Sequence, residues 1–235
     1  MKRFYEDVSV DEIDGGFRIL LDGRPLKTPG KATLLTPVQG VAEAVASEWR
    51  EQGEKIEPSA MPITRLATTA MDRMPELREP AIQEITDYTG TDLLCYRAPK
   101  PDDLVQRQHE CWQPPLDWME QRYGIQFDVT GSLLPVPQSK ATIEGVRGIV
   151  ETIDDWPLVG LHGATTGLGS VILALALWHG EIDAGGAADA SLLDELFEIE
   201  QWGQERDASR RHEVLRRDIK GIATYLQHLP PKPLT

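Results

Sequence analysis

The residues most suggestive of chemistry form a glycine-rich stretch from Gly163 to Gly169. Its GxxxGxG spacing is one that nicotinamide-dependent reductases use to bring a helix N-terminus against a pyrophosphate. Such a site needs a preceding parallel strand and a residue that binds the ribose about 20 positions later, whereas this stretch lies late and precedes helical sequence. We interpret it as small residues that let two buried helices pack closely. A nucleotide-dependent oxidoreductase that uses the stretch as a loop is the alternative.

The other reactive side chains lack the spacing of known catalytic or metal sites. Ser139 and Ser170 have no GxSxG elbow, and Cys95 and Cys111 are too far apart for a CxxC motif. The histidines show no HExxH or other ligand spacing. They are His109, His162, His179, His212 and His228. We therefore predict no catalytic residue, no metal site and no cofactor.

Charged residues are segregated near the C-terminal end of the chain. An acidic part contains Asp194, Glu195, Glu198, Glu200 and Glu205, and a basic part contains Arg206, Arg210, Arg211, Arg216, Arg217 and Lys220. This segregation is typical of a partner-binding surface, and equally of a solvated helix pair with local ion pairs. Trp202, followed by Gly203, is either a packing corner between helices or an exposed anchor of the kind that dominates interfaces.

Composition excludes some classes of function. The net charge of -14 repels nucleic acid, and the hydrophobic fraction of 40% indicates a chain that folds by itself. The longest apolar run, from Val171 to Trp178, is shorter than the roughly 20 residues that cross a bilayer, so we expect a buried helix and no membrane insertion. Without a signal or transit pattern at Met1, we expect a cytoplasmic bacterial protein, or a mitochondrial matrix protein if the chain is processed and eukaryotic.

The first 58 residues read as a small α+β domain. Apolar residues alternate from Phe4 to Leu35 around a turn at Asp22-Gly23, which predicts an antiparallel sheet. Thr36, as the N-cap of a capping box, predicts the start of a helix that packs on the sheet. Trp49 completes the apolar face of this helix, so we expect it in the core.

Residues 59–235 read as a second, larger and mainly helical domain, with an extra strand or hairpin at 125–136. Ser139 is the predicted cap of one helix. The glycines and alanines at 185–188 read as a flexible connector, and a capping-box-like start follows at Ser191. The predicted fold class is α+β, a small N-terminal antiparallel sheet packed by a helix and followed by the helical domain.

Several sequence blocks, taken in order, carry a family resemblance. They are DGRPLKTP at 22–29, ASEW at 46–49 with Gln52-Gly53, MPITRLA at 61–67 and TDLLCYR at 91–97. Together they resemble the F1-ATPase assembly chaperone family of mitochondria and alpha-proteobacteria, which binds the alpha subunit of ATP synthase. The resemblance implies a chaperone without catalysis, nucleotide or metal. Its partner would be free F1 alpha subunit, kept from aggregating until the F1 hexamer assembles.

The resemblance also implies roles for individual residues. Glu195 and Trp202 align with the C-terminal motif of the family, and we expect partner binding in this region. The residues expected to bind the partner are Glu195, Glu198, Trp202 and Asp207, and those expected to be structural are Trp49, Arg65 and Asp92. The chain departs from the expected acidic pattern at Arg206.

Overall fold

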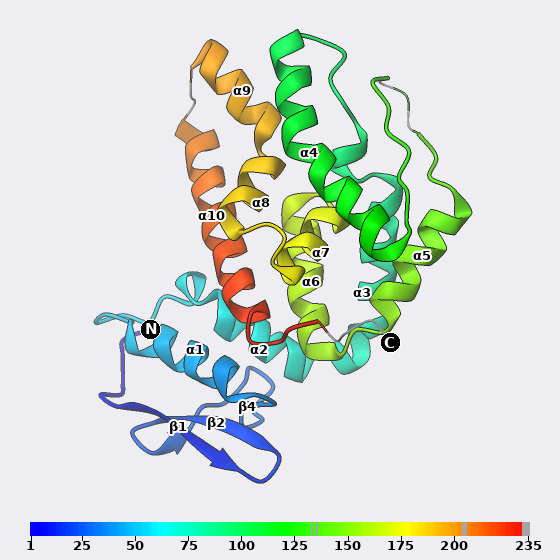
Figure 1. The fold of residues 1–235 in the computed structure, drawn as a ribbon. Helices are drawn as coiled ribbons and strands as arrows, with labels where there is room; N and C mark the ends of the chain where they lie inside the picture. The colour runs from blue at the N-terminus through cyan, green and yellow to red at the C-terminus, as the bar shows by residue number, and fades with distance from the viewer. Residues whose placement is uncertain (133, 135, 204–205, 232–235) are drawn as a thin grey trace. The chain divides into compact units, whose positions relative to one another are not determined.

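The computed structural model describes residues 1–132, 134, 136–203 and 206–231, and these residues form a small sheet followed by helices (Figure 1). This confirms the predicted fold class. The strands are β1 (Val8–Ile13), β2 (Gly16–Leu21), β3 (Arg24–Pro25) and β4 (Leu35–Thr36). The α-helices are α1 (Gln39–Arg50), α2 (Pro62–Asp72), α3 (Met74–Asp87), α4 (Asp102–Tyr123), α5 (Lys140–Glu151), α6 (Asp155–Leu168), α7 (Val171–His179), α8 (Ala184–Ser191), α9 (Leu193–Trp202) and α10 (Arg206–Leu226).

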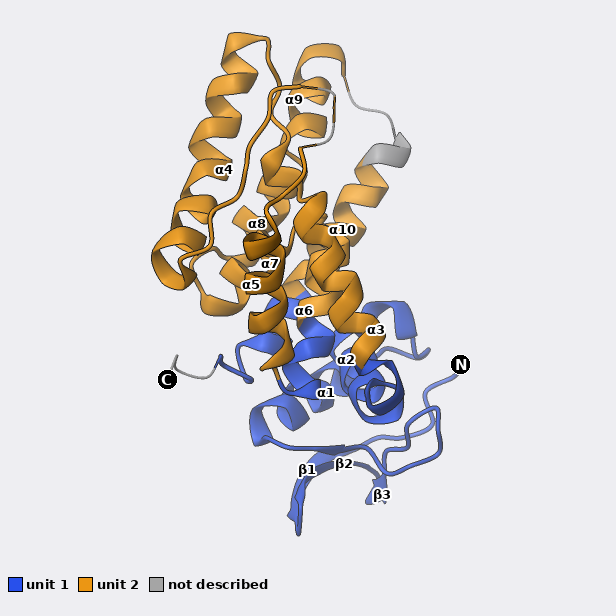
Figure 2. Cartoon of the chain, turned by 90° about the vertical axis from the view of Figure 1, so that its right-hand side faces the viewer, with its two compact units in different colours: residues 1–78, 154–160, 221–235 blue, residues 79–153, 161–220 orange. Residues whose placement is uncertain are grey.

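The chain divides into two compact units (Figure 2). Unit 1 comprises residues 1–78, 154–160 and 221–235, and unit 2 comprises residues 79–153 and 161–220. The predicted domain boundary at residue 58 stays a prediction. Three helices, α3, α6 and α10, begin in one unit and end in the other, so each unit is assembled from segments distant in sequence.

Unit 1 is built on a four-stranded sheet in which β2 is central. β1 pairs antiparallel with one edge of β2, and β3 and β4 both pair with β2. The tight connection at Asp22 and Gly23 has positive φ at both residues, 48° and 73°, which is the geometry that an Asp-Gly hairpin turn supplies. The alternating pattern therefore predicted this sheet.

Helix α1 packs against β1 and β2 and buries Val41, Val45 and Trp49. Trp49 is 9% exposed, and the Tyr5 hydroxyl donates a 2.7 Å hydrogen bond to its carbonyl oxygen. The predicted Thr36 capping box is wrong. Thr36 belongs to β4, and its hydroxyl donates to the carbonyl oxygens of Phe17 and Val38, so the helix begins three residues later without a side-chain cap.

A buried carboxylate from α1 caps the next helix instead. Glu48 accepts hydrogen bonds at 2.7 Å from the backbone N–H groups of Ile63 and Thr64 and from the Thr64 hydroxyl. These amides lie in the first turn of α2, where a helix leaves N–H groups without internal partners. Glu48 thus fastens α1 to α2 through charge-assisted bonds. Burial raises the pKa of Glu48 above its usual range, although these hydrogen bonds and the Arg65 charge act in the opposite direction.

Unit 2 is organised around α7, whose residues from Val171 to Leu177 are all buried. A helix that is apolar on every side belongs in a core, as the sequence predicted. Ser170 caps it by accepting from the Leu173 N–H at 3.0 Å, and α4 and α8 pack against it. The Trp112 indole of α4 also donates to the Ala190 carbonyl oxygen of α8 at 2.8 Å.

Some local expectations for the helical part are corrected. The Gly-Ala stretch expected to be a connector lies in α8, which Asp183 caps by accepting from the Gly186 N–H at 2.7 Å. Ser191 ends that helix and donates to the Leu168 carbonyl oxygen, so it does not start the next one. In the described residues of 125–136, the only pairing is a parallel bridge from Thr130 to Tyr96. The cap at Ser139 is confirmed by its bond from the Thr142 N–H.

The core position of Trp49 generates a stability prediction. Trp49→Arg should lower the free energy of unfolding by several kcal/mol, because it buries a charge without a partner and removes a large apolar side chain. Urea unfolding followed by circular dichroism measures it. Trp49→Phe is the matched control and should cost only about 1–2 kcal/mol, since the indole nitrogen has no hydrogen-bond partner to lose. Wild-type stability in the arginine variant would contradict the assignment.

Candidate partner-binding surface

The acidic helix α9 is fastened along one face to α4, within unit 2. The Gln108 amide nitrogen donates to the Asp194 carboxylate at 2.7 Å, and Arg107 lies 2.8 Å from the Glu200 carboxylate. Between them, the Arg107 guanidinium carbon lies 5.3 Å from the centroid of the buried Phe197 ring. This face of α9 is therefore occupied by intramolecular contacts.

A second contact holds α9 to α10. The Glu195 carboxylate accepts a hydrogen bond of 2.8 Å from His212 Nε2, and it also pairs with Arg211. His212 is buried, with 5% of its surface exposed. The hydrogen bond from His212 is the main reason that the pKa of Glu195 lies below its usual range, and Arg211 adds to the effect. Glu195, expected to bind a partner, therefore already has partners within the chain.

The remaining face of α9 points to solvent and carries an exposed aromatic ring. Trp202 is 88% exposed, the largest exposed fraction among the large hydrophobic residues described. Glu198, one helical turn earlier, is also exposed, and the structure gives it no ion pair or hydrogen bond among the described side chains. We call Glu198 and Trp202, with Glu195 at their border, the α9 face. The exposed ring does not fit the packing corner, and the role of Trp202 as a partner-binding anchor stays a prediction.

The other predicted site residues are spread over both units. Arg65 is exposed on α2 in unit 1, and Trp49 lies in the core of that unit. Asp92 is completely buried in unit 2. Asp207 is the second residue of α10, and its side chain lies outside the described residues. Among the predicted site residues whose side chains the structure describes, only Glu195, Glu198 and Trp202 share one surface.

Asp92 caps the core helix of unit 2. One carboxylate oxygen accepts from the Leu94 N–H at 3.1 Å, and the other accepts from the Ser170 hydroxyl at 2.9 Å and the Ile172 N–H at 3.2 Å. Burial raises the pKa of Asp92 to about 6, against the lowering effect of these hydrogen bonds. This arrangement is that of a structural carboxylate without access to a substrate.

The glycine-rich stretch does not form a loop. Residues from Gly163 to Leu168 lie inside α6, so their amides belong to a helix and not to a phosphate-binding turn. A Cβ atom added to Gly167 would lie 3.4 Å from the Ile219 side chain of α10. This supports the interpretation that small residues allow two helices to approach closely.

The histidines that flank the apolar helix have separate partners. His162 Nε2 lies 2.8 Å from the Glu84 carboxylate, and His179 Nε2 lies 2.6 Å from the Tyr123 hydroxyl. Burial, with a smaller effect of Arg122, lowers the pKa of His179 to about 4. Across the part of the chain that the structure describes, no three His, Cys, Asp or Glu side chains are placed to hold a metal ion. Within the same residues, no helix is both long and apolar enough to cross a bilayer.

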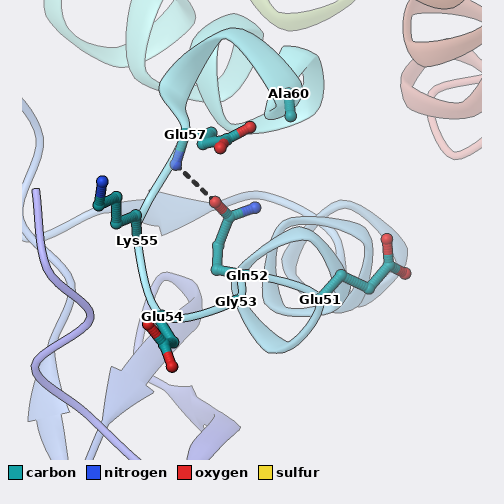
Figure 3. Close-up of a pocket in the computed structure, with 7 residues that line it drawn as sticks. All are labelled: Glu51, Gln52, Gly53, Glu54, Lys55, Glu57 and Ala60. Carbon is teal, nitrogen blue, oxygen red and sulfur yellow. Dashed lines mark hydrogen bonds between the residues drawn. The ribbon is translucent and has the colours of Figure 1, made fainter.

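Unit 1 has a shallow hollow of about 370 Å³ beside the end of α1 (Figure 3). Glu51, Glu54 and Glu57 line it, and Figure 3 shows their side chains pointing in different directions. Gln52 crosses it to accept a 2.7 Å hydrogen bond from the Glu57 N–H. Because its carboxylates point in different directions, they are not arranged to act together on a bound substrate. The Gln52 hydrogen bond instead stabilises the loop.

The fold has counterparts in known proteins. A model of the ATP12 chaperone protein family matches residues 2–120. The chain belongs to the ATP12 chaperone family. This confirms the resemblance found in the sequence. The mitochondrial atp12 protein of Schizosaccharomyces pombe is 25% identical over 231 residues, which cover 93% of this chain and 78% of the relative. The mitochondrial ATP12 protein of Saccharomyces cerevisiae is 22% identical to this chain, and the match covers 80% of that protein.

Solved structures agree with this assignment. Atp12 from Paracoccus denitrificans is 36% identical and superposes with a TM-score of 0.90, covering 96% of this chain and 97% of that one. The Atu1473 protein of Agrobacterium tumefaciens is 37% identical with a TM-score of 0.92, covering 97% of this chain and 86% of that one. The family assignment implies a chaperone.

Sequence reasoning missed the residues that hold the α9 face in place. Arg107 and Gln108 of α4 contact a helix that lies more than 80 residues later, and His212 reads as one of several scattered histidines. No local pattern indicates these pairs. The one available signal is the acidic run itself, because four acids without a basic neighbour on α9 favour cations from other helices, as Glu195 and Glu200 have.

The buried carboxylate generates a pH prediction. Because the native pKa of Asp92 is raised, ionisation opposes folding, so its contribution to stability falls as pH rises from about 4 to about 6. The cost of Asp92→Asn should therefore be larger at pH 4.5 than at pH 7, by about 2 kcal/mol. Urea unfolding at both pH values measures this difference. Glu181→Gln, an exposed control, should cost the same at both. A cost that grows with pH would contradict the raised pKa.

Proposed function

We propose that this chain is an ATP synthase assembly chaperone that binds free F1 alpha subunit and prevents its aggregation until the F1 hexamer assembles. Membership of the ATP12 chaperone family is the observation that carries the proposal. The chaperone acts by masking a surface of the alpha subunit that would otherwise meet a beta subunit. No specific observation favours a second function, since the stretch required by the oxidoreductase alternative is helical.

The α9 face supplies a physical means of capture. A tryptophan ring that is 88% exposed leaves apolar area in water, and burying such a side chain contributes about 1.5–3 kcal/mol. Trp is among the residues that most often dominate binding energy at interfaces. Glu198 adds a negative charge beside the ring, which favours a client surface that carries lysine or arginine. One strong anchor with a polar border suits a client that must later be released.

Capture of a client also requires that the anchor be held in a fixed orientation, and the contacts of α9 hold it. The Arg107–Glu200 ion pair and the Gln108–Asp194 hydrogen bond fix one side of the helix, and Glu195 fixes it to His212. A helix held in this way pre-orders the anchor, so less conformational entropy is lost when the client binds. On this proposal Glu195 positions the face, whereas Glu198 and Trp202 contact the client.

Co-expression with the F1 alpha subunit of the same organism, in the absence of beta subunit, tests the proposed function. Alpha subunit should remain soluble and elute with this chain in size-exclusion chromatography, and added beta subunit should dissolve the complex. Insoluble alpha subunit, with this chain eluting alone, would refute the proposal.

Substitutions on the α9 face provide a second prediction. Trp202→Ala should weaken capture of the alpha subunit by roughly 30-fold, the size expected for an interface hot spot, and Glu198→Lys should weaken it as well. Neither should lower the melting temperature, because both side chains are exposed. Glu181→Lys makes the same charge change at an exposed position after α7 and should leave capture unchanged. Equal capture by all three variants would place the client elsewhere.

A further inference from the structure

The outer edge of β1 in unit 1 has no strand beside it. β2 pairs with β1 on one edge and with β3 and β4 on the other, so β1 ends the sheet (Figure 2). In the part of the chain that the structure describes, no further strand pairs with it. An unpaired strand edge is a template for an added strand, which is a common mode of peptide recognition.

The register shows which backbone groups face this free edge. The Asp22 N–H donates to the Asp7 carbonyl oxygen at 3.0 Å, and hydrogen-bonded positions alternate along an antiparallel pair. Residues 7, 9, 11 and 13 therefore bond to β2, and Val8, Val10 and Glu12 direct their N–H and C=O groups outward. A hydrogen bond of 3.1 Å from Arg50 Nε to the Val8 carbonyl oxygen is consistent with this outward direction. Val10 and Glu12 remain open, and Glu12 is exposed.

Charge indicates what chemistry the edge would accept. The segment from residue 6 to residue 14 carries five acids and no lysine or arginine, and these are Glu6, Asp7, Asp11, Glu12 and Asp14. Arg18 on β2 neutralises Asp11 through an ion pair of 2.6 Å, and Arg50 also pairs with Glu43. The remaining charge at the edge is negative. A second copy of the same edge would place like charges opposite each other, which is destabilising.

We infer that the free edge of β1 is a docking site for an extended, basic segment of a partner polypeptide. The segment adds one strand to the sheet through the outward groups of Val10 and Glu12. Its lysine or arginine side chains lie beside Glu12 and the acids that flank β1, which provides the selectivity. The inference does not depend on which protein supplies the segment, and it concerns a surface distinct from the α9 face.

The test uses the full chain and a short synthetic peptide that alternates lysine with valine, with fluorescence anisotropy as the readout. The peptide should bind with an affinity that falls as salt rises, and amide exchange at Val10 and Glu12 should slow on binding. A peptide in which glutamate replaces lysine should not bind. Absence of binding by the lysine peptide, or exchange at Val10 and Glu12 that stays unchanged, would overturn the inference.

Two substitutions test separately how the outward backbone N–H and the negative charge of the edge contribute to peptide binding. Val10→Pro removes an outward N–H without removing a bond to β2, and Glu12→Lys reverses a charge at the same edge. Each should weaken peptide binding at least about tenfold, while Glu181→Lys, with the same charge change as Glu12→Lys, should not. Undiminished binding in both edge variants would overturn the inference. Self-association through the edge as concentration rises would also overturn it, because the occupant would then be a second copy.

Discussion

The buried carboxylate of Asp92 is the interaction on which the helical unit depends. Helix α7 is apolar on all sides and lies in a core, so water cannot satisfy the N–H groups of its first turn. Asp92 meets part of this need by accepting from the Ile172 N–H, and it also accepts from the hydroxyl of Ser170, 78 residues later in the sequence. Neighbouring helices pack on this buried helix. α4 packs on α7, and Arg107 and Gln108 of α4 in turn hold α9 so that Trp202 is displayed.

Unit 1 uses the same device on a smaller scale. Glu48 of α1 satisfies the first turn of α2, as Asp92 does for α7. In both cases burial raises the pKa of the carboxyl group, so the hydrogen bonds offset only part of the desolvation cost of the ionised form. Removing one partner would leave a charge or several amides unsatisfied. The buried carboxylates thus join elements inside each unit, and the surfaces proposed to bind partners are the α9 face in unit 2 and the edge of β1 in unit 1.

Sequence patterns predicted the elements whose signals are local. The hairpin at Asp22-Gly23, the apolar helix from Val171 and the cap at Ser139 depend on neighbours within a few residues. Local signals failed where distant contacts decided the outcome. Thr36 joined the sheet instead of capping a helix. The acidic stretch and Trp202 of the candidate surface were predicted from the sequence, but the contacts that hold α9 to α4 and α10 were not. The pairing of Glu195 with His212 joins two helices, and no spacing within either one encodes it.

The central claim is that the α9 face contacts free F1 alpha subunit, and site-specific photocrosslinking tests it most directly. A photoreactive amino acid would replace Trp202 in one variant and Glu181 in another, and each variant would be co-expressed with alpha subunit in the absence of beta subunit. We expect a crosslink to alpha subunit from position 202 and none from position 181. Absence of a crosslink at position 202, or equal crosslinking from both positions, would contradict the claim.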